Sequence, residues 1–269
     1  MMVENLGQFA LFLSLAFIVT WASYIKNYYK LPFKNFEGPQ ITLTDVFSTF
    51  FIFIASYFLL APLFRDSIFG QISAFFLTFT LFSLYTFFCN PKELLRAIKD
   101  KTFPGALPYK KDLEIGFFSF IFALPVVSAI TSLTEIVTSL FIAPTNKEQV
   151  AVKFLKESLS HPSTAFIALF SILIIAPLFE EFLFRGVLFS YLRRKIGPIS
   201  AIFTSSLIFT LFHFSPSQSV ENFPLLLTLF ALGSYLAFAY EKTRSLSTSI
   251  LLHVTFNSIS VIRIIFTSV

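Results

Sequence analysis

The chain has 269 residues, of which 55% are hydrophobic and only 13% are charged. Soluble chains carry about 25% charged residues, so this composition excludes an ordinary soluble domain and indicates a protein that crosses a membrane several times. The net charge of +5 is compatible with nucleic-acid binding, but the basic residues lie in short segments between apolar runs, so we expect no nucleic-acid partner. The single cysteine, Cys89, excludes an intrachain disulfide and a cysteine-based metal cluster.

Eight apolar stretches are long enough to cross a bilayer. They cover residues 7–25, 44–63, 67–89, 113–143, 163–192, 198–214, 223–240 and 246–266. We therefore expect an all-α polytopic membrane protein with about eight transmembrane helices, embedded in a lipid bilayer. The first stretch has neither the basic segment nor the small-residue cleavage site of a signal peptide, so we interpret it as a retained membrane helix.

The basic residues are distributed unevenly between the connecting loops. Fourteen lysines and arginines follow the first, third, fifth and seventh stretches, and only four occupy the other loops. The first group is Lys26, Lys30, Lys34, Lys92, Arg96, Lys99, Lys101, Lys110, Lys111, Arg193, Arg194, Lys195, Lys242 and Arg244, and the second is Arg65, Lys147, Lys153 and Lys156. The positive-inside rule makes the first group cytoplasmic and places both termini outside. We expect a multi-pass protein of a bacterial cytoplasmic membrane.

Two glutamates and an arginine interrupt the fifth apolar stretch. Ionisable groups inside a membrane helix are costly and by default indicate a functional site. Glu181 and Arg185 are four residues apart with the acid first, the favoured order for a helical ion pair. Glu180 points about 100° away on the helical wheel, so we predict that Glu181 is the structural partner of Arg185 and Glu180 the free carboxylate. Pro177, just before the glutamates, is the expected position of a bend.

The sixth stretch supplies a histidine at matching depth. Glu180 lies 17 residues before Gly197, and His213 lies 15 residues after Pro198. At the rise of a helix these positions are about 25 and 22 Å from the turn, on antiparallel helices. A carboxylate and an imidazole at one depth can bind a water between them and deprotonate it. Depth is predicted in this way, whereas the direction in which the side chains face is not.

The eighth stretch carries His253 and Asn257, four residues apart and therefore on one helical face. Both side chains offer N–H groups that can stabilise a developing oxyanion. Each of these polar residues has a simple packing explanation when taken alone. Their occurrence together, at similar depths, favours a catalytic site in the bundle formed by the last four helices.

Three motifs resemble those of a known family. Glu180-Glu181-x-x-x-Arg185, Phe209-x-x-x-His213 and His253-x-x-x-Asn257, with flanking sequences such as APLFEEFLFRGVLFSYL and SSLIFTLFHF, are similar to the CAAX prenyl protease type II family. This is the CPBP group of intramembrane endopeptidases, also called the abortive-infection domain. The resemblance covers about residues 163–260, so we divide the chain into N-terminal transmembrane helices, 1–160, and a protease-like region, 161–269.

The resemblance implies a peptide-bond hydrolase with a site sunk in the membrane that opens toward the cytoplasm and takes a peptide or membrane-protein substrate. By resemblance, Glu180 and His213 activate the water, His253 and Asn257 stabilise the oxyanion, and Glu181 and Arg185 hold the architecture. We expect no cofactor.

Two alternatives remain open at this stage. Glu180, His213 and His253 would also make a catalytic zinc site of two histidines and one carboxylate, although the chain has no H-E-x-x-H motif. The other alternative is a non-enzymatic membrane protein, such as an immunity or scaffold factor that keeps the fold without proteolysis.

Overall fold

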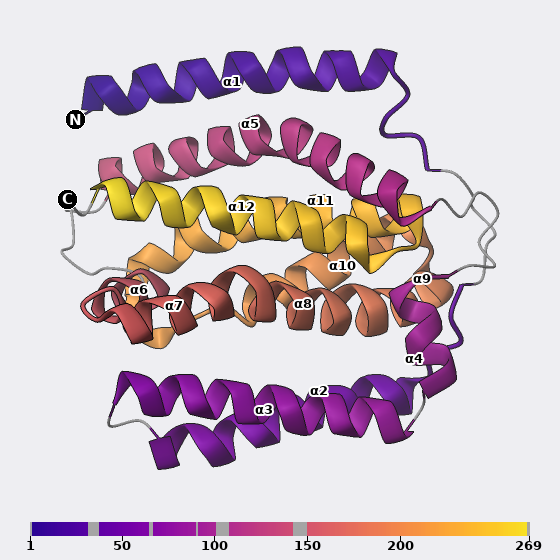
Figure 1. The fold of residues 1–269 in the computed structure, drawn as a ribbon. Helices are drawn as coiled ribbons and strands as arrows, with labels where there is room; N and C mark the ends of the chain where they lie inside the picture. The colour runs from indigo at the N-terminus through magenta and orange to yellow at the C-terminus, as the bar shows by residue number, and fades with distance from the viewer. Residues whose placement is uncertain are drawn as a thin grey trace.

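The structure is a computed structural model that describes residues 2–31, 38–64, 67–89, 91–100, 108–141 and 150–267 (Figure 1). Every regular element within these ranges is helical, and the only strand-like pairing there is one isolated bridge between Lys99 and Ser245. The expected all-α membrane fold is therefore confirmed.

The helices follow the predicted stretches closely. Their bounds are α1 Met2–Ile25, α2 Leu43–Leu60, η1 Ala61–Phe64, α3 Ile68–Cys89, α4 Pro91–Ile98, α5 Tyr109–Phe141, α6 Val150–Ser158, α7 Pro162–Phe170, η2 Ser171–Ile175, α8 Ala176–Glu181, η3 Phe182–Phe189, α9 Ser190–Ile196, α10 Pro198–Leu211, η4 Pro216–Glu221, α11 Asn222–Thr243 and α12 Leu246–Thr267. Among the described residues, six helical spans are long and apolar enough to cross a membrane. The other two predicted stretches correspond to α3, with 22 residues, and to α10, with only 14.

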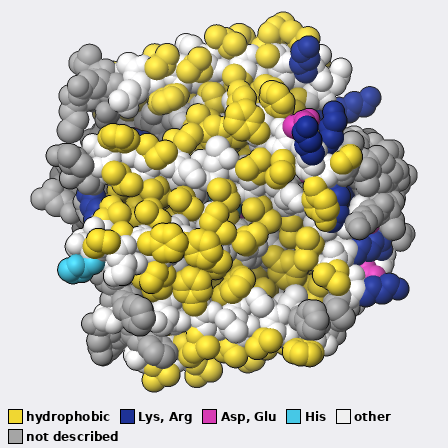
Figure 2. All heavy atoms as spheres, in the orientation of Figure 1, with side chains coloured by type: hydrophobic (Ala, Val, Ile, Leu, Met, Phe, Trp, Pro, Cys, Tyr) yellow, Lys and Arg dark blue, Asp and Glu magenta, His cyan; other side chains and the backbone are white. Residues whose placement is uncertain are grey.

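The chain runs back and forth, so the connections collect at two ends of the bundle (Figure 1). We call the end with the α9–α10 and α11–α12 turns and α4 the basic end, and the end with both termini and α6 the terminal end. Described residues of the basic end include Lys26, Arg96, Arg194 and Arg244. Figure 2 shows most of the lysine and arginine side chains on this face at the basic end. Lys34, Arg65, Lys101 and Lys147, which were also counted above, lie outside the described residues.

Helix α5 joins the N-terminal helices to the protease-like region. It packs against α1 on one side and against α11 and α12 on the other. Its contact with α12 is close at Gly116, where an added Cβ would lie 2.7 Å from the backbone oxygen of Thr248. The boundary that we placed between residues 160 and 161 therefore rests on the family resemblance alone. The packing of the helices continues across it.

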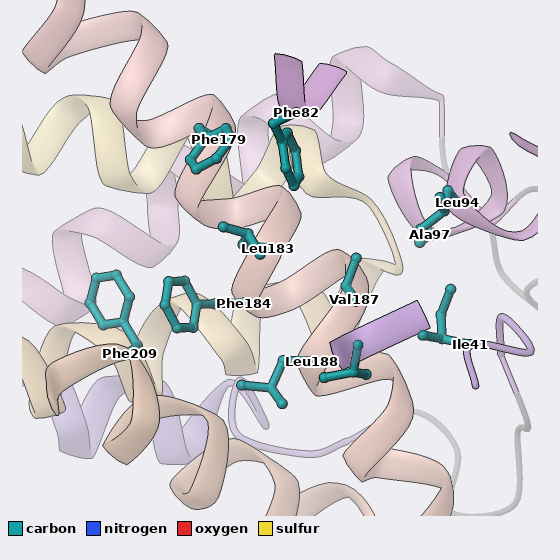
Figure 3. Packing of buried hydrophobic residues seen from close by; sticks show 11 residues of the cluster. Ile41, Phe82, Leu94, Ala97, Phe179, Leu183, Phe184, Val187, Leu188 and Phe209 are labelled. Carbon is teal, nitrogen blue, oxygen red and sulfur yellow. The ribbon is translucent and has the colours of Figure 1, made fainter. Parts of the chain in front are cut away.

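Aromatic residues build the core between α2, α3 and the long fifth span. The ring of Phe179 lies 4.4 Å from that of Phe82 and 4.8 Å from that of Phe53, between centroids. One turn further, Phe184 meets Phe209 of α10 edge to face at 5.1 Å (Figure 3). These pairs hold the fifth span between α2–α3 and α10, and so fix the rotation of the helix that carries Glu180 and Glu181.

A buried polar network closes the basic end. Glu241 forms ion pairs with Arg193 at 3.3 Å and with Arg244 at 2.5 Å, and all three side chains are almost completely buried. Tyr240 donates its hydroxyl hydrogen to the backbone oxygen of Ala97, 2.7 Å away, and the N–H of Asp100 donates to the backbone oxygen of Arg244. These contacts attach the α4 segment to the α11–α12 turn. The basic end is thus sealed by paired charges rather than left open.

The close α5–α12 contact leads to a stability prediction. Gly116→Ala should destabilise the protein by about 1–3 kcal/mol, because the new methyl group collides with a backbone oxygen that cannot rotate away. Thermal unfolding of the purified protein in detergent measures the effect. Gly7→Ala is the matched control, since nothing lies within 4 Å of a Cβ at that position. Equal unfolding temperatures for the two variants would contradict the assigned contact.

Candidate active site

The fifth predicted stretch is one continuous helical span of 35 residues, from Pro162 to Ile196. It is not a regular α-helix, because two π-helical segments, η2 and η3, flank the short α8 that carries both glutamates. The bend expected at Pro177 corresponds to a local change of helix type, with the π-helical η2 ending two residues before the proline.

The π-helical turn leaves one backbone oxygen without a backbone N–H donor, so a side chain can donate a hydrogen bond to it. The N–H of Ala176 bonds the oxygen of Ser171, five residues back. In this register the oxygen of Ile172 would pair with residue 177, which is a proline and has no N–H. Asn257 of α12 fills the gap, because its Nδ2 donates to the Ile172 oxygen at 3.1 Å. The amide of Asn257 is thereby anchored to the helix that carries the glutamates.

Glu181 and Arg185 form the predicted i, i+4 ion pair, and neither side chain has any exposure. Arg185 Nη1 lies 3.1 Å from Glu181 Oε1. Arg185 Nη2 donates to the backbone oxygen of Gly233 in α11 at 3.0 Å, and the guanidinium lies 4.5 Å from the centre of the Phe209 ring. The pair therefore connects the fifth span to both α10 and α11.

Gly233 is a residue of this site that the motif search did not find. An added Cβ would lie 3.2 Å from Phe209, 3.3 Å from Ser206 and 3.4 Å from Arg185. A glycine here lets α10 approach α11 and leaves its carbonyl oxygen open to the arginine. The only sequence signal was a lone glycine inside an apolar helix, which has a packing or functional reason in many proteins.

Glu180 faces both histidines. Its Oε2 lies 3.9 Å from His213 Nε2 and 3.9 Å from His253 Nε2. The side chains of Glu180 and His213 are 24% and 32% exposed, whereas that of His253 is only 5% exposed. The structure thus brings the predicted free carboxylate and the two predicted imidazoles to one point, partly accessible from outside the protein.

The second nitrogen of each imidazole is occupied. His213 Nδ1 lies 2.9 Å from the backbone oxygen of Phe209, and His253 Nδ1 lies 2.8 Å from Glu181 Oε1. Both partners are hydrogen-bond acceptors, so we assign the proton of each neutral ring to Nδ1. Each Nε2 then presents a lone pair toward Glu180. Three acceptors therefore converge, an arrangement that is stable only with a shared proton, a hydrogen-bond donor such as water, or a cation between them.

A known family matches the part of the chain that carries these residues. Residues 162–259 match the family model of the Rce1-like type II CAAX prenyl endopeptidases. The C-terminal region is therefore similar to the Rce1-like CAAX proteases. This match confirms the resemblance drawn from the three motifs.

A curated relative supports the same assignment. The chain is 34% identical over 102 residues to the membrane-embedded CAAX protease MroQ of Staphylococcus aureus strain USA300. The match covers 36% of this chain and 38% of the relative, so the similarity concerns only part of each protein. The comparison with solved structures found no match. The C-terminal region is thus similar to membrane-embedded CAAX proteases, and the relative named here is bacterial.

The two adjacent glutamates should differ in their effect on stability. Glu181→Gln leaves the buried Arg185 without its counter-ion, and removing one partner of a buried pair typically costs about 3–5 kcal/mol. Glu180→Gln is nearly isosteric and affects a partly exposed carboxylate that has no ion pair with Arg185, so it should cost much less. Thermal unfolding in detergent compares the two variants. Similar losses for both would refute the division into a structural and a free carboxylate.

Proposed function

We propose that the protein is an intramembrane endopeptidase in which Glu180 and His213 activate a water molecule for attack on a peptide bond. The proposal is carried by the convergence of Glu180 Oε2 with the Nε2 atoms of His213 and His253, each at 3.9 Å. The substrate that we propose is a peptide segment of a membrane-associated protein, reached from within the bilayer or at its surface.

The separation of Glu180 and His213 suits a shared water. Atoms 3.9 Å apart are too far for a direct hydrogen bond, but one water at about 2.8 Å can donate to both. In the attack, Glu180 or His213 takes a proton from the water while the water oxygen bonds to the carbonyl carbon of the substrate. The proton is then passed to the leaving amine as the tetrahedral intermediate collapses.

His253 is placed to stabilise the oxyanion once it carries a second proton. With both histidines neutral, Glu180, Glu181 and Arg185 together have a net charge of −1, so one proton on an imidazole makes the group neutral. His253 lies between the two carboxylates, 2.8 Å from Glu181 Oε1 and 3.9 Å from Glu180 Oε2. As an imidazolium it would donate from Nε2 to the developing oxyanion while Nδ1 stays bound to Glu181.

Asn257 fits the same role through its second N–H. A carboxamide nitrogen has two hydrogens, and the contact with the Ile172 oxygen uses only one of them. Because that contact fixes the amide against the helix of the glutamates, the remaining N–H has a defined direction. We propose that it completes the oxyanion site with His253.

A zinc-dependent version of the protease would use Glu180, His213 and His253 as ligands. Each imidazole is oriented through Nδ1 by an oxygen, as in many zinc sites. The separations argue against this version, because tetrahedral zinc ligands at about 2.0–2.1 Å lie roughly 3.4 Å apart and these atoms lie 3.9 Å from Glu180. No group of three or more histidine, cysteine, aspartate or glutamate side chains in the described ranges is arranged to hold a metal ion. We therefore propose the metal-free mechanism.

Glu180→Gln tests the function. It keeps the shape of the side chain but removes the base, so cleavage should fall by roughly 10²–10⁴-fold. The measurement compares membrane peptidomes of cells that carry the native chain, Glu180→Gln or no chain. Glu114→Gln is the control, because Glu114 is an exposed glutamate on α5 that pairs with the exposed Lys111. A protein that acts without proteolysis would leave all the peptidomes alike.

Metal dependence is tested on the purified protein in detergent. We expect full activity after exhaustive treatment with a zinc chelator, since no step requires a metal. Added zinc should not raise the activity of the treated sample. Loss of activity on chelation and its return with zinc alone would replace the proposed mechanism by the zinc-dependent one.

A further inference from the structure

A groove lies at the end of α1, away from the residues that the proposed chemistry uses. It is a partly open hollow of about 550 Å³, within the size range of sites for small molecules. Its lining residues come from the last turns of α1 and the chain that follows, and they are Trp21, Tyr24, Ile25, Asn27, Tyr29 and Lys30. We call these six residues the α1 groove. Four are aromatic or aliphatic and two are polar, so the groove suits a ligand with both an apolar and a polar part.

A regular helix ending shapes the groove. The N–H of Tyr28 donates to the backbone oxygen of Ser23 at 2.8 Å. The N–H of Asn27 donates to the backbone oxygen of Tyr24 at 3.0 Å. Together with the φ of 53° at Asn27, these two bonds form a Schellman motif, whose left-handed residue is often a glycine or an asparagine. The chain therefore turns sharply at Asn27, and residues on both sides of the turn line one hollow.

Contacts from the bundle hold this turn in place. The buried Tyr28 donates its hydroxyl hydrogen to Ser119 of α5 at 2.6 Å. Lys242 of α11 donates from Nζ to the backbone oxygen of Tyr28 and lies 4.4 Å from the centre of its ring. The hydroxyl groups of Tyr29 and Tyr235 lie 3.0 Å apart. The groove is thus supported from behind by α5 and α11.

The groove carries positive charge. Lys30 lines it, Lys26 is exposed in the same turn, and the half-buried Lys242 lies behind it. Within the described part of the chain, none of these three ammonium groups has a carboxylate at ion-pair distance. The acidic residues near the start of α5 are engaged by other lysines. The groove therefore favours an anionic ligand.

The position of the groove along α1 corresponds to the membrane interface. Trp21 and Tyr24, 60% and 73% exposed, lie at the end of the apolar span Leu6–Ile25. Tryptophan and tyrosine are enriched at this level of a bilayer, because their rings are apolar and their polar groups reach water. Lys26 and Lys30 follow where the chain leaves the span. Rings toward the bilayer and ammonium groups toward water match the order of acyl chain and phosphate in a phospholipid.

We propose that the α1 groove binds the headgroup of an anionic phospholipid. Lys30 contacts the phosphate, and the rings of Trp21 and Tyr24 lie along the glycerol and the upper acyl chains. The positive-inside rule assigns this end of the bundle to the cytoplasmic leaflet. Because α1 lies at the edge of the bundle and packs mainly against α5 (Figure 1), the bound lipid holds an outlying helix at its depth. The proposal is independent of the proposed proteolysis.

Fluorescence quenching by brominated lipids tests the groove. Trp21 is the only tryptophan of the chain, so its emission reports on this place alone. The full chain is reconstituted in phosphatidylcholine nanodiscs that contain the same small fraction of either dibrominated phosphatidylglycerol or dibrominated phosphatidylcholine, brominated at the same acyl positions. Lys30→Gln tests the groove. Lys195→Gln is the matched control, because it removes the same charge from another exposed lysine of the basic end, on α9.

We expect phosphatidylglycerol to quench Trp21 at a lower mole fraction than phosphatidylcholine, by at least about fivefold, since each lysine at a membrane surface favours anionic lipid by roughly that factor. Lys30→Gln should lower this preference by about fivefold, and Lys195→Gln should leave it unchanged. Equal quenching by the two lipids in the native chain would refute the site. Equal losses in the two variants would show a general attraction of the basic end instead.

A last arm separates a lipid from a free anion. Inorganic phosphate, added to nanodiscs of phosphatidylcholine alone, should not change the emission of Trp21, because it lacks the apolar part that the rings contact. A saturable change with phosphate would replace the lipid site by a site for small anions and overturn the proposal.

Discussion

The ion pair of Glu181 and Arg185 is the constraint around which the C-terminal region is built. Neither side chain reaches solvent, and a buried pair is tolerable only when neighbouring groups satisfy its remaining hydrogen-bonding atoms. The carbonyl oxygen of Gly233 and the imidazole of His253 each satisfy one of these atoms, and they come from α11 and α12. Satisfying the pair therefore draws both helices against the fifth span. The same contacts carry His253 to within 3.9 Å of Glu180, so the structural pair also assembles the reactive group.

Much of this arrangement could be predicted from local sequence. The eight apolar stretches are visible in hydropathy, and the pairing of Glu181 with Arg185 follows from helical spacing alone. Matched depths for Glu180 and His213 follow from counting residues on either side of the turn at Gly197. The direction in which these two side chains point cannot be predicted in this way, because the rotation of each helix is set by long-range packing such as that of Phe179 against Phe82.

Other parts of the site had no local signal. The contact between Asn257 and Ile172 depends on a π-helical turn, which hydropathy does not reveal, and on a proline that cannot fill the resulting gap. Gly233 is informative only once α10 and α11 are known to cross there. Local patterns thus identify the chemical groups, and tertiary packing decides how they come together.

The packing of α5 determines how much of the chain is needed to form a stable bundle. The segment that matches the family model begins well after α5 in the sequence, yet α5 supplies Phe120, Ala123 and Val127 to the core shared with Leu232, Leu236 and Leu252. Excised by itself, the recognisable segment would present that apolar surface to lipid and leave the α11–α12 turn without the backbone partners of α4. Homology therefore marks where the chemistry resides, while the autonomous folding module is larger and includes helices that carry no recognisable signature.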